Sequence, residues 1–124
     1  DIELGNRLAD HPQKLSYGEK RRLNLAAILL HGPKLLLIDE LLIGQDPINA
    51  KLWMSLLQAI SKMGFSLILV IHQSQLTIEY CDRVVFLEEG HIIIDDEVSS
   101  AFDSLLELGY HAFLPKDQSE KMNA

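Results

Sequence analysis

The apolar residues of this 124-residue chain alternate between helical spacing and short continuous runs. Ser16 is followed three residues later by Glu19 and then by an apolar stretch, which is typical of the capping box that starts a helix; Gly32 marks the end of this helix. Residues 35–38 are all apolar and have turn residues around them, which favours a parallel strand buried on both faces. The pattern therefore begins with a helix and a core strand.

A second helix is predicted from Pro47, with Asp46 as its cap and Gly64 just beyond its end. Residues 66–71 form another apolar run. A strand, a helix and a strand in this order pair the two strands in parallel through a right-handed crossover, so we expect an α/β fold. The face of the second helix that is expected to be buried consists of Ile48, Leu52, Leu56 and Ile60, joined by Trp53 and Leu57.

The remaining predicted elements are shorter. Glu88, Glu89 and Gly90 separate two apolar runs, which is typical of an antiparallel hairpin. Residues 115–124 are expected to be a disordered tail. The other predicted elements are a helix over 1–10, a helix over 74–80, hairpin strands over 83–87 and 91–95, and a helix that Ser99 or Ser100 caps and Gly109 ends.

Charge and composition exclude some classes of function. The net charge of −7 and the isoelectric point near 5.1 argue against a nucleic-acid-binding surface, because such domains usually carry a basic face. The single cysteine, Cys81, has no partner for an intramolecular disulfide, and we expect it to be a small packing residue in a reducing location. No apolar run approaches the roughly 18 residues that span a bilayer, so any membrane role is expected to come through a partner.

Two features at the start of the first helix are unusual for a helix. Gly18 lies in the first turn, where glycine costs roughly 1 kcal/mol against alanine, and residues 20–22 place cations at the positive end of the helix dipole. Both features are explained if an anion docks there, because glycine permits close approach and free N–H groups at a helix start bind phosphate. The alternative, of equal weight from these residues alone, is a capped amphipathic helix with a basic, solvated first turn.

Polar residues follow both predicted core strands. Asp39 and Glu40 come directly after the first apolar run, and His72 comes after the second. Because the carboxyl ends of parallel strands meet at one edge of the sheet, we expect these residues to converge. One carboxylate suits a magnesium ion held through water, and another can orient or deprotonate an attacking water. Taken singly, acids after a strand are also common loop residues, and a lone histidine often bonds only a neighbour.

Together these stretches resemble the C-terminal half of an ABC ATPase domain, over most of the chain from about residue 15 to 95. The order and spacing of four motifs carry the resemblance. The sequences of residues 15–23 and 43–47 are most similar to energy-coupling-factor ATPases of cobalt- or biotin-type importers. The four matching stretches are Leu15–Glu19 with the signature motif, usually LSGGQ, Leu35–Glu40 with the Walker B strand, Ile43–Asp46 with the D-loop, and Val70–His72 with the switch histidine.

The resemblance implies a fold and a division of the chain. The fold is the parallel-sheet core of a P-loop NTPase-like (RecA-like) ABC ATPase, incomplete, with helices on the faces of the sheet and a C-terminal antiparallel hairpin. Residues 1–114 then consist of a signature-motif helical segment (1–34), a segment from Walker B through the switch histidine to the hairpin (35–95), and a C-terminal helix (96–114). Residues 115–124 remain the expected tail.

The resemblance also implies a role for each matching residue, with ATP and Mg²⁺ as cofactors. In the complete domain, Asp39 holds Mg²⁺ through water and Glu40 is the catalytic residue that activates the hydrolytic water. His72, also catalytic, senses the terminal phosphate, and Asp46 in the D-loop links the two sites of a dimer. The residues that contact the terminal phosphate of an ATP held by the other subunit are Ser16, Tyr17, Gly18 and Glu19.

The chain also departs from the family pattern. These 124 residues contain no G-x-x-x-x-G-K-[ST] phosphate loop, no glutamine loop and no aromatic residue for the adenine. Because the phosphate loop supplies most of the contacts to the nucleotide, we expect the chain alone to be inactive and to be an N-terminally truncated piece. Smaller departures that concern loop geometry are Tyr17, Glu19, Leu41, Leu42 and Gln45.

The function implied by the resemblance is an ATP-binding and ATP-hydrolysing subunit that powers an ABC transporter at the cytoplasmic face of a membrane. The expected partners are a second ATPase subunit, in a head-to-tail dimer, and transmembrane subunits, without nucleic acid. Exposed apolar strand edges also lead us to expect self-association. Two alternatives stay open: a half-domain of a non-transport ABC ATPase, such as the SMC-like DNA-repair proteins, and a non-enzymatic docking or dimerisation fragment.

Overall fold

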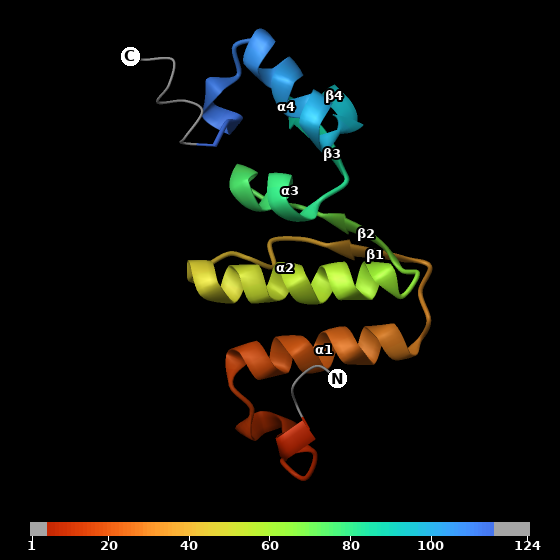
Figure 1. The fold of residues 1–124 in the computed structure, drawn as a ribbon. Helices are drawn as coiled ribbons and strands as arrows, with labels where there is room; N and C mark the ends of the chain where they lie inside the picture. Colours follow the sequence, from red (N-terminus) through yellow and green to blue (C-terminus); the bar gives the residue numbers. More distant parts are fainter. Residues whose placement is uncertain (1–4, 116–124) are drawn as a thin grey trace.

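The computed structural model describes residues 5–115, so the predictions for residues 1–4 and for the tail at 116–124 lie outside the described part. The helices and strands form two neighbouring groups along the chain (Figure 1). In chain order the elements are the 3₁₀ turns η1 (Gly5–Arg7) and η2 (Pro12–Lys14), then α1 (Tyr17–Leu30), β1 (Leu35–Ile38), α2 (Pro47–Lys62), β2 (Ser66–Leu69), α3 (Ser74–Tyr80), β3 (Arg83–Glu88), β4 (His91–Glu97), α4 (Val98–Glu107) and the 3₁₀ turn η3 (His111–Phe113).

Residues 5–10, the described part of the helix predicted over residues 1–10, do not form an α-helix. Gly5–Arg7 form one 3₁₀ turn, and an ion pair joins Arg7 Nε to Asp10 Oδ2 at 2.8 Å. Glycine and asparagine are among the poorer helix formers, and they occupy positions 5 and 6. The spacing of the apolar residues alone therefore overestimated the tendency of this segment to form an α-helix.

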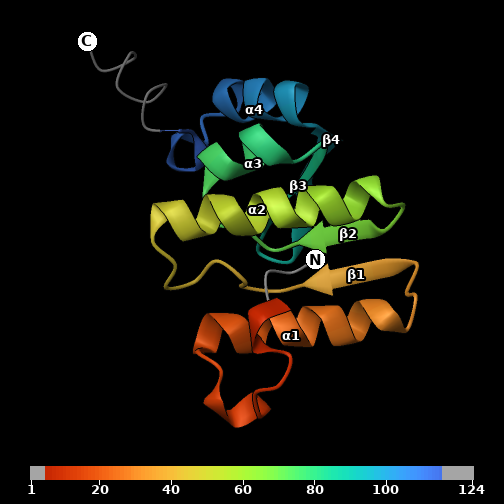
Figure 2. The same cartoon turned by 60° about the horizontal axis from the view of Figure 1, so that its bottom comes forward.

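β1 and β2 form a parallel pair, as predicted from the order of strand, helix and strand. Leu36 lies opposite Leu67, and the Val70 N–H donates to the Ile38 carbonyl at 2.9 Å. β2 ends at Leu69, before the predicted end at residue 71. Figure 2 shows α1 beyond β1, on the side away from β2, and α2 running along the strand pair.

β1 is buried on one face only, so the prediction of a strand buried on both faces is wrong for the described structure. Leu36 is 5 % exposed, whereas Leu35 and Leu37 are 54 % and 73 % exposed. The side chain of Leu36 belongs to the cluster that α2 completes, and the described elements leave the opposite side of the strand open. This open apolar face, formed by Leu35, Leu37, Ile68 and Val70, lies where self-association is predicted.

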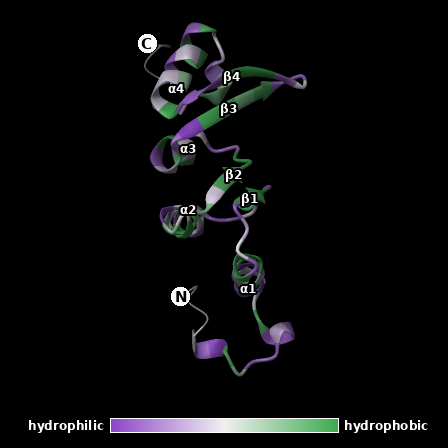
Figure 3. Cartoon of the chain, turned by 90° about the vertical axis from the view of Figure 1, so that its right-hand side faces the viewer, coloured by the Kyte–Doolittle hydropathy of each residue, from purple (hydrophilic) through white to green (hydrophobic). Residues whose placement is uncertain are grey.

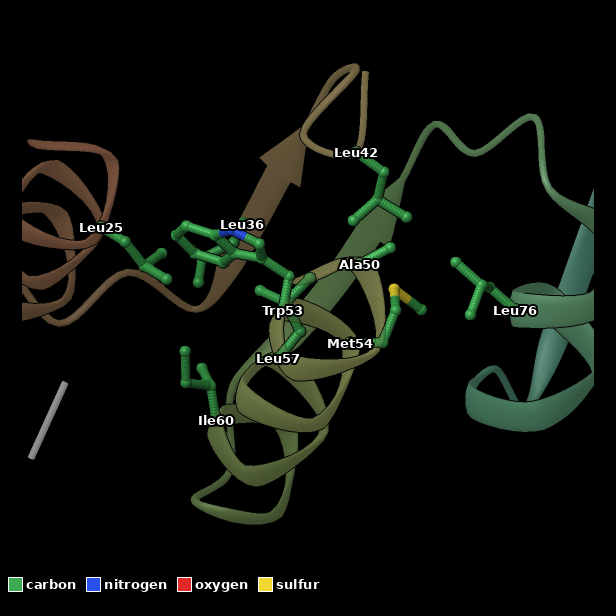
Figure 4. Packing of buried hydrophobic residues seen from close by; sticks show 9 residues of the cluster. All are labelled: Leu25, Leu36, Leu42, Ala50, Trp53, Met54, Leu57, Ile60 and Leu76. Atoms are coloured by element: carbon green, nitrogen blue, oxygen red, sulfur yellow. The ribbon is translucent and has the colours of Figure 1, made fainter. Parts of the chain in front are cut away.

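The buried face of α2 differs from the predicted one. Ile48 and Leu52 were expected inside, but they are 75 % and 58 % exposed. Apolar residues occupy more than one side of this helix, so their spacing alone admitted two adjoining faces. Packing selects the face with the small Ala50, which is 2 % exposed. The buried residues of α2 are Ala50, Trp53, Met54, Leu57 and Ile60, and Figure 4 shows them among Leu25, Leu36, Leu42 and Leu76.

The hairpin of β3 and β4 packs with α4 into a second apolar cluster. The two strands pair antiparallel, as predicted, with an irregularity between Phe86 and Leu87. The rings of Phe86 and Phe102 meet edge to face with their centroids 5.6 Å apart. Both hairpin strands carry mainly hydrophobic residues along their middles (Figure 3). The buried members of this cluster are Ile94, Ala101, Phe102, Leu105 and Leu114.

The N-cap of α4 lies two residues before Ser99, the nearer of the two predicted serine caps. Its N-cap is Glu97, which makes no side-chain capping bond. The Val98 N–H instead donates to the Asp82 carbonyl at 3.2 Å. Because the backbone of a neighbouring segment satisfies this amide, the helix start does not depend on a Ser side chain.

None of the helices within residues 5–115 is both long enough and apolar enough to cross a membrane. The longest, α2, has 16 residues.

The substitutions Leu57→Ala and Leu52→Ala compare the two sides of α2. Leu57 is 2 % exposed and Leu52 is 58 % exposed. We expect Leu57→Ala to lower the free energy of unfolding by about 2–5 kcal/mol, because it leaves a cavity in the cluster. Leu52→Ala should change it by less than about 0.5 kcal/mol. Urea unfolding followed by the fluorescence of Trp53 measures both, and equal losses would contradict the burial of this face.

Candidate functional site

A capping box closes the first turn of α1, as predicted. The Ser16 N–H donates to Glu19 Oε2 at 2.7 Å, and the Glu19 N–H donates to Ser16 Oγ at 3.3 Å. Tyr17 is 70 % exposed, and a Cβ added at Gly18 would meet no atom within 4 Å. Packing among the described residues therefore does not require glycine at position 18, and the turn is open to solvent.

The pKa of the Glu19 carboxyl is held below its ordinary value. The largest cause is the hydrogen bond from the backbone N–H of Ser16, followed by the hydrogen bond with its side chain; the charges of Arg7 and Arg22 act in the same direction. An ionised carboxylate at this position also opposes the positive end of the helix dipole. The box is therefore fully formed at neutral pH.

Arg21 joins the first turns of α1 to the loop that follows β1. Its Nη1 donates to the Leu41 carbonyl at 2.8 Å in a partly buried contact. Its Cζ lies 5.0 Å from the centroid of the Tyr17 ring, a distance at which a cation and an aromatic face attract. Of the three cations that the sequence groups at the helix start, Arg21 makes this bond to another segment, whereas the charge of Arg22 acts on Glu19.

The parallel pairing brings the predicted acids and the predicted histidine to one edge of the sheet. Ile38 and Leu69, the last residues of β1 and β2, are partners in the register. Asp39 and Glu40 follow at once, and His72 lies three residues past the end of β2. All three residues are exposed. The two strand ends are thus adjacent, whereas the proximity of the three side chains and their individual roles stay predictions.

The backbone of Glu40 adopts a left-handed conformation, with φ of 53°. Such a conformation is uncommon for residues other than glycine and persists where the surroundings hold it. A turn follows directly, in which the Ile43 N–H donates to the Glu40 carbonyl at 3.2 Å. The side chain of Leu42, only 7 % exposed, anchors this turn in the first cluster. No local sequence pattern predicts this left-handed conformation, because glutamate rarely adopts it.

Asp46, the predicted D-loop residue, is the N-cap of α2. Its Oδ1 accepts from the backbone N–H groups of Ile48 and Asn49, at 3.0 Å each. The hydrogen bonds with Asn49 are the main reason why the pKa of this carboxyl lies below its ordinary value. The local fold therefore holds Asp46 ionised at the end of the same loop that begins with Asp39.

Within residues 5–115, no group of three or more His, Cys, Asp or Glu side chains is arranged to hold a metal ion. The donors at the sheet edge fit Mg²⁺ in a different way. This ion usually keeps several waters and takes one or two carboxylates together with phosphate oxygens. Asp39 can supply such a carboxylate, so the residues present suit a magnesium ion that arrives with a nucleotide.

Comparison with known proteins connects these features. The model of the ABC transporter family matches residues 2–42, a segment that contains both the first turn of α1 and the acids after β1. A Bacillus cereus protein that carries the name of an ABC transporter ATP-binding protein is 44 % identical over 86 residues, which are 69 % of this chain and 15 % of that protein. This chain is related to the ATP-binding proteins of ABC transporters.

Solved structures extend the comparison to nearly the whole chain. The structure of cbiO1 from Clostridium perfringens, described as part of the ABC transporter complex cbiONQ, has a TM-score of 0.71 at 27 % identity and covers 91 % of this chain and 45 % of that one. An ATP-binding cassette of an ABC transporter has a TM-score of 0.76 at 17 % identity, covering 92 % and 46 %. The predicted fold class, an α/β ABC ATPase core with a parallel sheet and an antiparallel hairpin, is therefore confirmed. The chain spans less than half the length of these relatives.

Glu19→Gln tests the charge in the capping box while keeping its hydrogen bonds. Because the pKa of Glu19 is lower in the folded chain, its charge stabilises the fold above the ordinary pKa of 4.5, and this contribution is lost as the pH falls through the folded value. We therefore expect wild type to lose its advantage over Glu19→Gln below about pH 4.5. Urea unfolding at several pH values measures this.

The matched control is Asp103→Asn, which neutralises an exposed acid on α4. A difference between wild type and Glu19→Gln that does not vary between pH 7 and pH 3 would contradict a charge-dependent box.

Proposed function

We propose that this chain is part of an ATP-hydrolysing subunit that powers transport across a membrane. The observation that carries the proposal is the parallel pairing of β1 with β2, which puts the segments of Asp39, Glu40 and His72 at one sheet edge. An acidic pair and an imidazole at such an edge suit a magnesium–nucleotide complex and its attacking water. The similarity to ABC transporter ATP-binding proteins supports the same function.

In this proposal each predicted site residue has a distinct task. Asp39 holds Mg²⁺ through water, Glu40 orients and deprotonates the attacking water, and His72 hydrogen-bonds the terminal phosphate. Asp46 connects this site with its counterpart on the other subunit. The turn from Ser16 to Glu19 contacts the terminal phosphate of an ATP held by that subunit. The exposure of Ser16 and Tyr17, together with the open space at Gly18, supports this task.

We further propose the setting in which the subunit works. The cbiO1 structure, from a protein described as part of an ABC transporter complex, supports an energy-coupling-factor type of importer at the cytoplasmic face of a membrane. The partners would be transmembrane subunits and a second ATPase subunit arranged head to tail. The SMC-like alternative has less support, because the similar proteins carry transport names. The docking alternative is favoured by one observation, the open apolar face of β1 and β2.

The first prediction of this proposal concerns nucleotide binding by the 124-residue chain alone. The sequence has no Gly-rich phosphate loop, and that loop supplies most nucleotide contacts. We expect calorimetric titration with Mg·ATP to give no affinity tighter than about millimolar. Micromolar binding would show that other residues of this chain supply the phosphate contacts.

The second prediction concerns the role of Glu40 in the complete ATPase assembly. Glu40→Gln keeps the size and a hydrogen-bonding oxygen but removes the base. We expect ATP binding to remain and turnover to fall by about 100-fold or more. Glu89→Gln is the matched control, because Glu89 is also an exposed glutamate with positive φ but lies in the hairpin turn. Undiminished hydrolysis by Glu40→Gln would remove this residue from the role.

A further inference from the structure

Arg21 is the side chain through which α1 reaches the loop after β1. The contact joins residues twenty positions apart, from the Arg21 Nη1 atom to the Leu41 carbonyl oxygen at 2.8 Å, and it is partly buried. α1 lies beyond β1 on the side away from β2 (Figures 2 and 3). The helix can therefore hold the end of β1 without competing for the pairing with β2.

The bonded carbonyl belongs to the residue directly after Glu40. On the C-terminal side of Glu40, three contacts hold the backbone. The Leu41 carbonyl accepts from Arg21, and the side chain of Leu42 is buried. The Glu40 carbonyl accepts from the Ile43 N–H. The Arg21 bond comes from α1 and fixes the Leu41–Leu42 peptide plane, which begins one residue after Glu40. The other two attachments lie within the loop or in the cluster beneath it.

The left-handed backbone of Glu40 needs such attachments, because it is an unfavourable conformation for a glutamate. A hydrogen bond from a cation is stronger than one between neutral groups. The Tyr17 ring, 5.0 Å from the Arg21 Cζ, restricts the guanidinium further. The charge and the stacking together make the Arg21 contact a firm support for this peptide.

We propose that Arg21 is a positioning residue that holds the Leu41 peptide and thereby the backbone conformation of Glu40. This inference rests on the proposed function for its catalytic consequence, but the effect on the loop is independent of it. The same side chain packs on Tyr17, in the turn proposed to contact the terminal phosphate of an ATP held by the other subunit. Arg21 therefore connects two turns that face different nucleotides in the proposed dimer.

The test compares Arg21→Met, which keeps the stem but has no donor, with Arg21→Lys, which keeps a charged donor. Arg83→Met is the control, because it removes an exposed arginine that pairs with Asp95 on the distant hairpin. In the complete ATPase assembly we expect Arg21→Met to lower kcat by about 10- to 100-fold, since small misplacements at a reacting centre have effects of this size. KM for ATP should stay within about twofold, because the proposal assigns Arg21 no contact with the nucleotide. Arg21→Lys should restore part of kcat, because it keeps a charged donor.

A second readout follows the loop itself in the 124-residue chain. In Arg21→Met, we expect the amides of Ile43 and Gln45, which are bonded to the Glu40 and Leu42 carbonyls, to exchange hydrogen at least about tenfold faster, because a charge-assisted bond is lost. The Arg83→Met variant should exchange there as wild type does. Unchanged exchange in Arg21→Met would overturn the proposal.

The two readouts separate this inference from the proposed function. Faster exchange in Arg21→Met, together with full hydrolysis in Glu40→Gln, would retain Arg21 as the support of the loop and reject Glu40 as the base. Faster exchange with unchanged kcat in Arg21→Met, where Glu40→Gln does lose activity, would overturn the positioning role. A loss of kcat that Arg83→Met shares would overturn it as well.

Discussion

The backbone pairing of β1 with β2 determines where this chain presents its polar chemistry. Both strands run in the same direction, so their carboxyl ends share an edge, and the residues after Ile38 and Leu69 emerge together. A slip of β1 by one residue would reverse its faces and move Leu36 out of the cluster under α2. The burial of Leu36 therefore also sets the position of Asp39 and Glu40.

Around this edge, each polar segment is supported by groups already present in the chain. The capping box of Ser16 and Glu19 pairs backbone N–H groups at the start of α1. The side chain of Asp46 does the same at the start of α2. Between these two helix starts lies the loop with Glu40, whose backbone conformation is unfavourable by itself. Rigid neighbours and one irregular loop are a common arrangement at functional sites, because the neighbours offset the strain of the loop.

The sequence was a good guide where local chemistry decides the structure, as in the capping box, the Asp46 cap, the parallel pair and the hairpin. It was a poor guide where several solutions satisfy the same pattern. The apolar residues of α2 allowed two faces, and only packing against β1 and β2 excluded Ile48 and Leu52 from the cluster. The contact of Arg21 with Leu41 depends on how α1 is placed in space, which no local pattern encodes.

The two apolar clusters have a consequence for the order in which the chain folds. One cluster draws its buried members from Leu25 to Leu76, and the other from Ile94 to Leu114, so neither interleaves with the other along the sequence. Structures built from neighbouring segments have low contact order and pay little loop-closure entropy. The buried residues of the amino-terminal cluster therefore do not include the hairpin, and the Ser74 hydroxyl, which donates to the Phe113 carbonyl, forms a hydrogen bond between the regions of the two clusters.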